Sequence, residues 1–149
     1  MKAPELFSDE DRVLIKAMIG EAEKMTSGEI RVYIDDDCKE DVMDKAAFVF
    51  AELDMHQTEQ RNGVLIYLAV NDRKFAIIGD AGIHAKVGND FWNRIKAEMG
   101  KMLSANRYRD ALVFGIREAG VQLQQYLPYQ RDDKNELPDD IVFGKGDVK

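Results

Sequence analysis

The sequence predicts an α/β protein in which a small mixed β-sheet, built from a βαβ unit and an antiparallel hairpin, lies between helices. Two apolar, β-branched runs at residues 63–70 and 74–78 are separated by the polar turn Asn71-Asp72-Arg73, a pattern typical of an antiparallel hairpin. A further strand pattern at residues 29–34 comes earlier, with a helical stretch between it and the hairpin. Such an order favours a right-handed crossover between parallel strands, so the sheet should be mixed.

Length and composition indicate a single soluble globular domain. The chain has 149 residues, of which 45% are hydrophobic and 33% are charged. Its formal net charge is −7 and its pI is near 4.9, which argues against nucleic acid or an anionic membrane surface as a partner. A divalent cation, or a basic protein partner, fits this charge better.

Cysteine content and hydropathy bear on the compartment. Cys38 is the only cysteine, so an internal disulfide and a multi-cysteine metal site are both excluded. No stretch approaches the roughly 18 apolar residues of a membrane span, and the opening MKAPELFSDEDR has no signal-peptide core. We therefore expect no membrane span and a cytoplasmic location.

Four helices are expected from capping residues and apolar periodicity. Ser8 is a typical N-cap for the first, which should end by Gly28. The second follows an acidic loop at residues 35–41, and its apolar positions run from Val42 to Leu53. Asn89 can cap the third, which carries an apolar face as far as residue 103, and the fourth should run from about residue 108 to 127, before a proline.

The remaining segments are expected to be irregular. Gly79-Asp80-Ala81-Gly82 is interpreted as a flexible hairpin exit that carries one carboxylate. Residues 1–128 should form the folded domain. Residues 129–149 are polar apart from Ile141-Val142-Phe143, and we expect an extended or mobile tail there.

Several short motifs together resemble a known family. They are Thr26–Val32, Arg61–Ile66, Asp72–Lys74, Gly79–Ile83, Ala85–Gly88, Tyr108–Leu112 and Gly115-Ile116. Over about residues 8–127 the chain resembles the TPM domain family, also described as thylakoid-lumen-phosphatase-like domains. The resemblance implies an α/β sandwich and binding of divalent cations, calcium in particular, and acid phosphatase activity has been proposed for some plant members. Many bacterial relatives carry a signal peptide and a membrane-spanning tail, which this sequence does not show.

A first candidate metal site follows from the predicted topology. Because strands one and two are parallel and strand three runs back, Glu29, Asn62 and Asp80 should meet at one end of the sheet. With Asp90 and Asp110 they would supply oxygen ligands for Ca²⁺ or Mg²⁺. The alternative is structural: Glu29 pairs with Arg61, while Asp80 and Asp90 cap turns and a helix.

A second candidate metal site lies at the opposite end of the sheet. Asp35, Asp36, Asp37 and Asp41 cluster where strand one ends, and open α/β sheets bind ligands at the carboxyl ends of their strands. The loop lacks the glycine and the terminal glutamate of an EF-hand. The alternative is a solvated charged loop.

The sequence gives more support for divalent-cation binding than for catalysis. It has no Walker-type phosphate loop and no cysteine-arginine loop around Cys38, and His56 and His84 do not show ligand spacing. No catalytic residue is therefore assigned. Two alternatives stay open: a weak phosphomonoesterase that uses Asp80 with Arg61, and an interaction module that uses the acidic surface or Ile141–Phe143.

Overall fold

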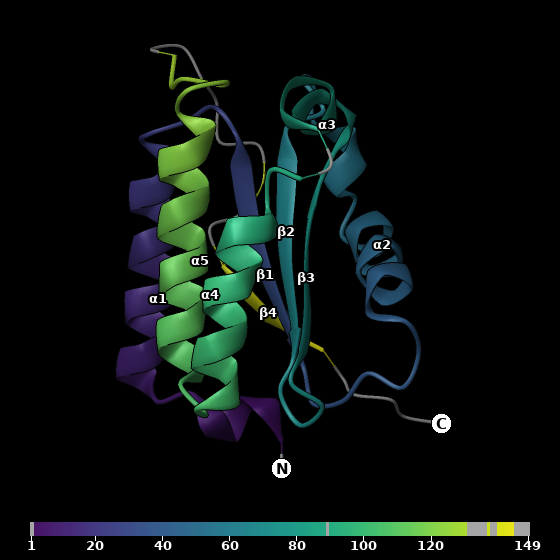
Figure 1. The fold of residues 1–149 in the computed structure, drawn as a ribbon, viewed down its shortest axis with the longest axis vertical. Helices are drawn as coiled ribbons and strands as arrows, with labels where there is room; N and C mark the ends of the chain where they lie inside the picture. Colours follow the sequence, from purple (N-terminus) through teal and green to yellow (C-terminus); the bar gives the residue numbers. More distant parts are fainter. Residues whose placement is uncertain (1, 89, 131–136, 138–139, 145–149) are drawn as a thin grey trace.

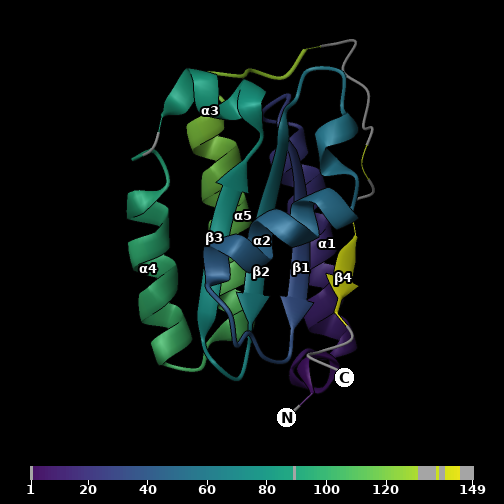
Figure 2. The same ribbon diagram turned by 90° about the vertical axis from the view of Figure 1, so that its right-hand side faces the viewer.

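In a computed structural model of the chain, one β-sheet separates two layers of helices. The structure describes residues 2–88, 90–130, 137 and 140–144. The sheet has the strand order β3-β2-β1-β4. Helices α1, α4 and α5 cover one face and α2 crosses the other (Figures 1 and 2). The predicted α/β architecture is confirmed.

The sheet contains the predicted mixture of parallel and antiparallel pairs. β1 (Glu29–Asp35) runs parallel to β2 (Gly63–Ala69), and Glu29 lies opposite Gly63. The crossover between them contains α2 (Val42–Glu52) and the short 3₁₀ helix η2 (Met55–Gln57). β2 then pairs antiparallel with β3 (Lys74–Gly79) through the predicted turn.

Three longer helices pack on the face away from α2. They are α1 (Asp9–Glu23), α4 (Asn93–Ser104) and α5 (Tyr108–Leu123), and the 3₁₀ helix η1 (Ala3–Leu6) comes before them. Ser8 caps α1 as predicted, because its hydroxyl accepts from the Asp11 amide at 3.0 Å. The expected cap at residue 89 lies outside the described residues.

Alternation along β1 divides the core into two parts. Ile30, Val32 and Ile34 point toward α1, α4 and α5, and all three are fully buried. Tyr33 points to the α2 side, where Tyr67 and other residues of β2 form a second cluster with α2. Both faces of β1 and β2 are therefore covered, as a parallel pair requires.

The sequence analysis did not predict the short 3₁₀ helices η1 and η2, and it also missed one α-helix and one strand. α3 (Ala81–Val87) begins directly after Asp80, in the segment expected to be a flexible hairpin exit. β4 (Ile141–Phe143) pairs parallel with β1, in the segment expected to be a tail. Both are short, and β4 depends on a partner more than 100 residues away along the chain. The domain boundary at residue 128 stays a prediction.

Among the described residues, no helix combines the length and the apolar character that crossing a bilayer requires.

Candidate functional site

The two ends of the sheet hold the candidate ligand residues. We call residues 26–29, 58–62 and 79–81 the amino edge, because β1 and β2 begin there. We call residues 35–41 and 70–74 the carboxyl edge, because β1 and β2 end there. The two edges lie at opposite ends of the strands (Figure 1).

At the amino edge, Asp80 is bound by an arginine. Arg61 Nε donates to Oδ2 of Asp80 and Arg61 Nη2 donates to Oδ1, each at 2.7 Å. The Ala81 amide also donates to Oδ1, which makes Asp80 the N-cap of α3. Burial alone would raise the pKa of Asp80, but these hydrogen bonds outweigh it and hold the pKa below its ordinary value. A cation here would compete with Arg61 for the same two oxygens.

Glu29 and Asn62 also reach the amino edge, and both bond to the backbone. Oε1 of Glu29 accepts from the Leu137 amide at 2.7 Å. The side-chain amide of Asn62 donates to the Ser27 carbonyl at 2.5 Å. The topology therefore brings Glu29, Asn62 and Asp80 to one edge as expected, and their contacts tie the loops of that edge together.

Asp90 has a local role in the turn before α4. It is exposed, and its Oδ1 accepts from the Asn93 side chain at 3.4 Å. The Asp90 carbonyl accepts from the Asn93 amide at 3.1 Å. These are the contacts of a turn-capping residue, which was the structural alternative for Asp90.

Asp110 lies far from the amino edge, so its expected proximity to that edge is wrong. Arg109 donates to Asp110 at 3.1 Å and lies 3.3 Å from Asp11, in the first turn of α1. The other end of α1 reaches the amino edge, because Glu23 accepts from the Ile30 amide there. A helix of 15 residues spans about 22 Å, and α5 begins at its far end.

At the carboxyl edge, two of the predicted aspartates are buried and bonded. Asp36 is 5% exposed, and it accepts from the Ala3 amide at 2.5 Å and pairs with Lys2 at 3.4 Å. Asp35 is 2% exposed and accepts from the Tyr67 hydroxyl at 2.6 Å. Burial, followed by this bond to a carboxylate, raises the pKa of Tyr67 well above its ordinary value.

The β2–β3 turn adds two residues to the carboxyl edge that the sequence analysis did not assign to a site. The Asn71 side-chain amide donates to Oδ1 of Asp37 at 3.1 Å. Asp72 Oδ2 accepts from the Cys38 amide at 2.7 Å. The carboxylates of Asp37 and Asp72 therefore lie beside the same short segment. The signal was available, because parallel strands end at the same edge and the turn after β2 must lie next to the loop after β1.

Asp41, the last of the predicted acids, caps a helix. Its Oδ1 accepts from the amides of Met43 at 2.9 Å and Asp44 at 3.1 Å, at the start of α2. Within the described residues, no group of three or more His, Cys, Asp or Glu side chains is arranged to hold a metal ion. A cation at the carboxyl edge would therefore need amide, carbonyl and water oxygens besides two carboxylates.

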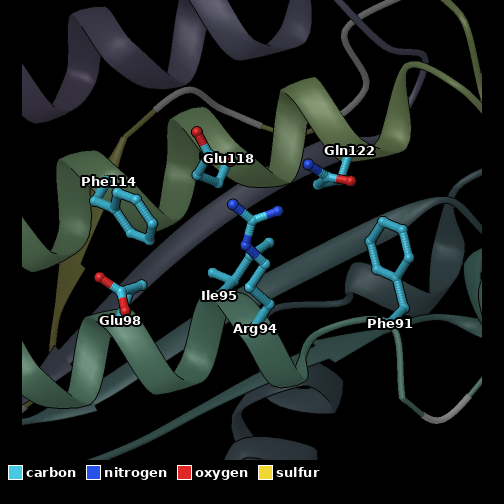
Figure 3. A pocket seen from close by; sticks show the side chains of 7 residues that line it. All are labelled: Phe91, Arg94, Ile95, Glu98, Phe114, Glu118 and Gln122. Carbon is cyan, nitrogen blue, oxygen red and sulfur yellow. The ribbon is translucent and has the colours of Figure 1, made fainter.

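A separate hollow of about 450 Å³ lies between α4 and α5. Figure 3 shows Arg94 rising from α4 between the two helices, with Phe91 and Phe114 on either side. Glu98 and Glu118 line the same hollow on opposite helices. This hollow is on the sheet face opposite α2 and shares no residue with either edge.

This arrangement of a β3-β2-β1-β4 sheet between α2 and three helices is found in a known class of domains. Residues 2–122 match the TPM domain, and the chain belongs to that family. It is 41% identical to the BA42 protein of the psychrophilic bacterium Bizionia argentinensis, whose NMR structure it matches with a TM-score of 0.87 over 93% of this chain and 95% of that one.

Two more distant structures share the fold. The N-terminal domain of a P. gingivalis protein is 15% identical, with a TM-score of 0.69 over 85% of this chain and 82% of that one. The N-terminal domain of cg2496 from Corynebacterium glutamicum is 11% identical, with a TM-score of 0.62 over 96% of this chain and 84% of that one. A comparison with curated proteins gives no match.

Proposed function

We propose that this TPM-domain protein binds a divalent cation, Ca²⁺ in preference to Mg²⁺, at the carboxyl edge of its sheet. The observation that carries the proposal is the position of Asp37 and Asp72. Each carboxylate accepts a hydrogen bond from the residue next to the other aspartate, Asp72 from the Cys38 amide and Asp37 from the Asn71 side chain. Backbone carbonyls of the exposed loop residues 39–41, with water, can supply further oxygen ligands. Ca²⁺ takes six to eight oxygens at about 2.3–2.6 Å and tolerates irregular geometry, so it suits a loop site better than Mg²⁺.

The amino edge is the weaker place for this cation. The Asp80 carboxylate already has a cationic partner in Arg61, and each of its oxygens accepts at 2.7 Å. A cation that binds Asp80 must first displace the bidentate guanidinium, which reduces its net binding free energy. At the carboxyl edge Asp37 and Asp72 accept from neutral amides. The Lys74 ammonium donates to the Cys38 carbonyl at 3.1 Å on the same segment, so a divalent cation gains there through its higher charge.

The bound cation would act electrostatically on the two loops of the carboxyl edge. Without a cation, Asp37 and Asp72 repel one another across the β1–α2 loop and the hairpin turn. A bound cation relieves this repulsion and joins the two loops. Because the ligands must be deprotonated, affinity should fall as the pH drops through the carboxylate range.

Calorimetric titration with calcium chloride and with magnesium chloride tests the proposal. We expect Asp37→Asn and Asp72→Asn each to weaken calcium binding by roughly tenfold or more, since each removes one charged ligand. Asp80→Asn is the matched control at the amino edge, and it should leave the calcium affinity unchanged. Circular dichroism of each variant checks that the fold is retained.

Two outcomes would contradict the proposal. Calcium binding that persists in both Asp37→Asn and Asp72→Asn would show that the carboxyl edge is not the binding site. Binding that is lost only with Asp80→Asn would move the site to the amino edge.

A further inference from the structure

A second hollow, of about 560 Å³, lies on the outer side of α1. Its lining residues are five from α1 and one from α5, namely Asp9, Glu10, Val13, Leu14, Ala17 and Arg109. We call it the α1 hollow. It shares no residue with the amino edge, the carboxyl edge or the hollow between α4 and α5.

The floor of the α1 hollow is apolar, although it lies away from the core. Ile15 and Ile19 are fully buried on the sheet side of α1. Val13 and Ala17 are each two residues from Ile15, which places them about 160° from it around the helix. Val13 is 68% exposed and Leu14 is 42% exposed, and Figure 1 shows no described element on that side of α1. A surface helix needs only one apolar side, so packing within this chain does not account for the second one.

The uncompensated charge at the rim of the α1 hollow is negative. Asp9 and Glu10 are exposed, and no described residue forms an ion pair with either of them. The Arg109 guanidinium, by contrast, lies 3.3 Å from Asp11 and 3.1 Å from Asp110. Its positive charge is therefore largely offset within the chain, and the two free carboxylates set the sign of the rim.

Charge distinguishes between the possible occupants of the α1 hollow. A two-fold contact between copies would press the same patch against itself, so Asp9 and Glu10 would face a rim of the same sign. The net charge of −7 on each copy adds to this repulsion, and it also disfavours an anionic membrane surface. A protein partner with apolar side chains for the floor, and lysine or arginine for the rim, is complementary in both respects.

The shape of the α1 hollow favours a helix over an extended segment. Its lining on α1 runs from residue 9 to residue 17, about 12 Å along the axis, which two turns of a docked helix would match. An extended segment binds mainly through backbone hydrogen bonds to a free sheet edge. The backbone of a helix is already bonded internally, so side-chain packing must supply the contact here.

We infer that the α1 hollow is a docking site for an amphipathic, basic helix of a protein partner. The apolar side chains of that helix, three or four residues apart, would lie over Val13, Leu14 and Ala17. Its lysine or arginine residues would pair with Asp9 and Glu10. The inference does not depend on the proposed cation site.

Fluorescence anisotropy with a synthetic helical peptide tests this docking site. The probe is a labelled peptide of about 14 residues, with leucine at every third or fourth position and lysine elsewhere. A second peptide carries glutamate in place of lysine. The full chain is titrated into each peptide without added divalent cation. We expect saturable binding of the lysine peptide that weakens as sodium chloride is added, and no binding of the glutamate peptide.

Three variants locate the contact. Val13→Ser removes an exposed apolar side chain, so it should weaken binding of the lysine peptide by roughly tenfold. The double variant Asp9→Asn with Glu10→Gln should weaken it by roughly threefold and reduce its salt dependence. Phe48→Ser is the matched control, because Phe48 is 57% exposed on α2, and it should leave the affinity unchanged. Circular dichroism checks that each variant is folded.

Amide NMR shifts induced by the lysine peptide in the unmodified protein should concentrate at residues 9–17 and 109–113. Shifts concentrated elsewhere, or no binding of this peptide, would show that the inference is wrong. Equal losses of affinity in Phe48→Ser and Val13→Ser would show the same. The inference also fails if light scattering finds that the chain alone is a dimer that Val13→Ser dissociates, because a second copy would then occupy the hollow.

Discussion

Arg61 and Asp80 form a two-pronged ion pair that closes the amino edge of the sheet, with both N–O distances at 2.7 Å. Arg61 lies in the loop before β2, and Asp80 follows β3 and caps α3. The pair therefore connects the entrance and the exit of the hairpin. The backbone of Arg61 has a left-handed conformation, with φ at 52°. Few non-glycine residues adopt this conformation.

Loss of the Asp80 charge should destabilise the fold. An asparagine at this position can still cap α3, so Asp80→Asn removes mainly the charged hydrogen bonds to Arg61. The Arg61 side chain is half exposed to solvent, which weakens these bonds. We expect the free energy of unfolding to fall by about 1 kcal/mol in urea titrations at pH 7.

The pH dependence of this effect has a definite sign. The pKa of Asp80 in the folded protein lies below its ordinary value of 3.8, so the stabilisation is complete above that pH. It should disappear as the pH falls through the lower, folded pKa. The stability gap between the protein and Asp80→Asn should thus be constant from about pH 5 to 8 and close in stronger acid. A gap that grows on acidification would contradict this account.

Tyr67 should remain un-ionised for as long as the protein is folded. Its hydroxyl is buried and donates to Asp35 at 2.6 Å, and both features raise its pKa. Because the folded pKa lies above the ordinary value of 10.0, stability should fall as the pH rises past 10. We expect Tyr67→Phe to cost about 1–2 kcal/mol at pH 7 and to lose stability less steeply above pH 10. A pH titration that records tyrosinate absorbance at 295 nm together with circular dichroism checks this prediction. Ionisation of Tyr67 while the circular dichroism is still native would contradict it.

Gly82 should tolerate no side chain. A Cβ atom there would lie 2.3 Å from the Gln60 carbonyl oxygen and 2.7 Å from that of Arg61, so α3 or the loop before β2 would have to move. We expect Gly82→Ala to lower the free energy of unfolding by about 2 kcal/mol. Gly100 in α4 is the matched control, since nothing lies within 4 Å of its Cβ position. Gly100→Ala should stabilise the protein by about 0.5–1 kcal/mol, and equal effects at both positions would contradict the packing argument.

Local patterns were sufficient to predict most of the fold. The hairpin, the βαβ unit and the long helices each have a periodicity that a few neighbouring residues define. α3 was missed because its seven residues follow Gly79 and include Gly82, a composition typical of loops. β4 was missed because three apolar residues become a strand only beside the free edge of β1, and no local pattern reveals that edge.

The side-chain contacts at the candidate sites could not be predicted from the sequence. Topology placed Glu29, Asn62 and Asp80 together, but it could not show that Arg61 would turn its guanidinium onto Asp80. Asp72 was recognised as a turn residue, and the parallel pairing of β1 with β2 already implied that its turn lies next to the loop after β1, although the register decides which aspartate of that loop it meets.

Calcium titration followed by amide NMR shifts is the most direct test of the proposed cation site. We expect saturable shifts at residues 35–41 and 70–74, with much smaller changes at residues 26–29, 58–62 and 79–81. Magnesium should produce the same pattern at higher concentration. Shifts concentrated at the second set of residues, or no saturable shift in either set, would contradict the account.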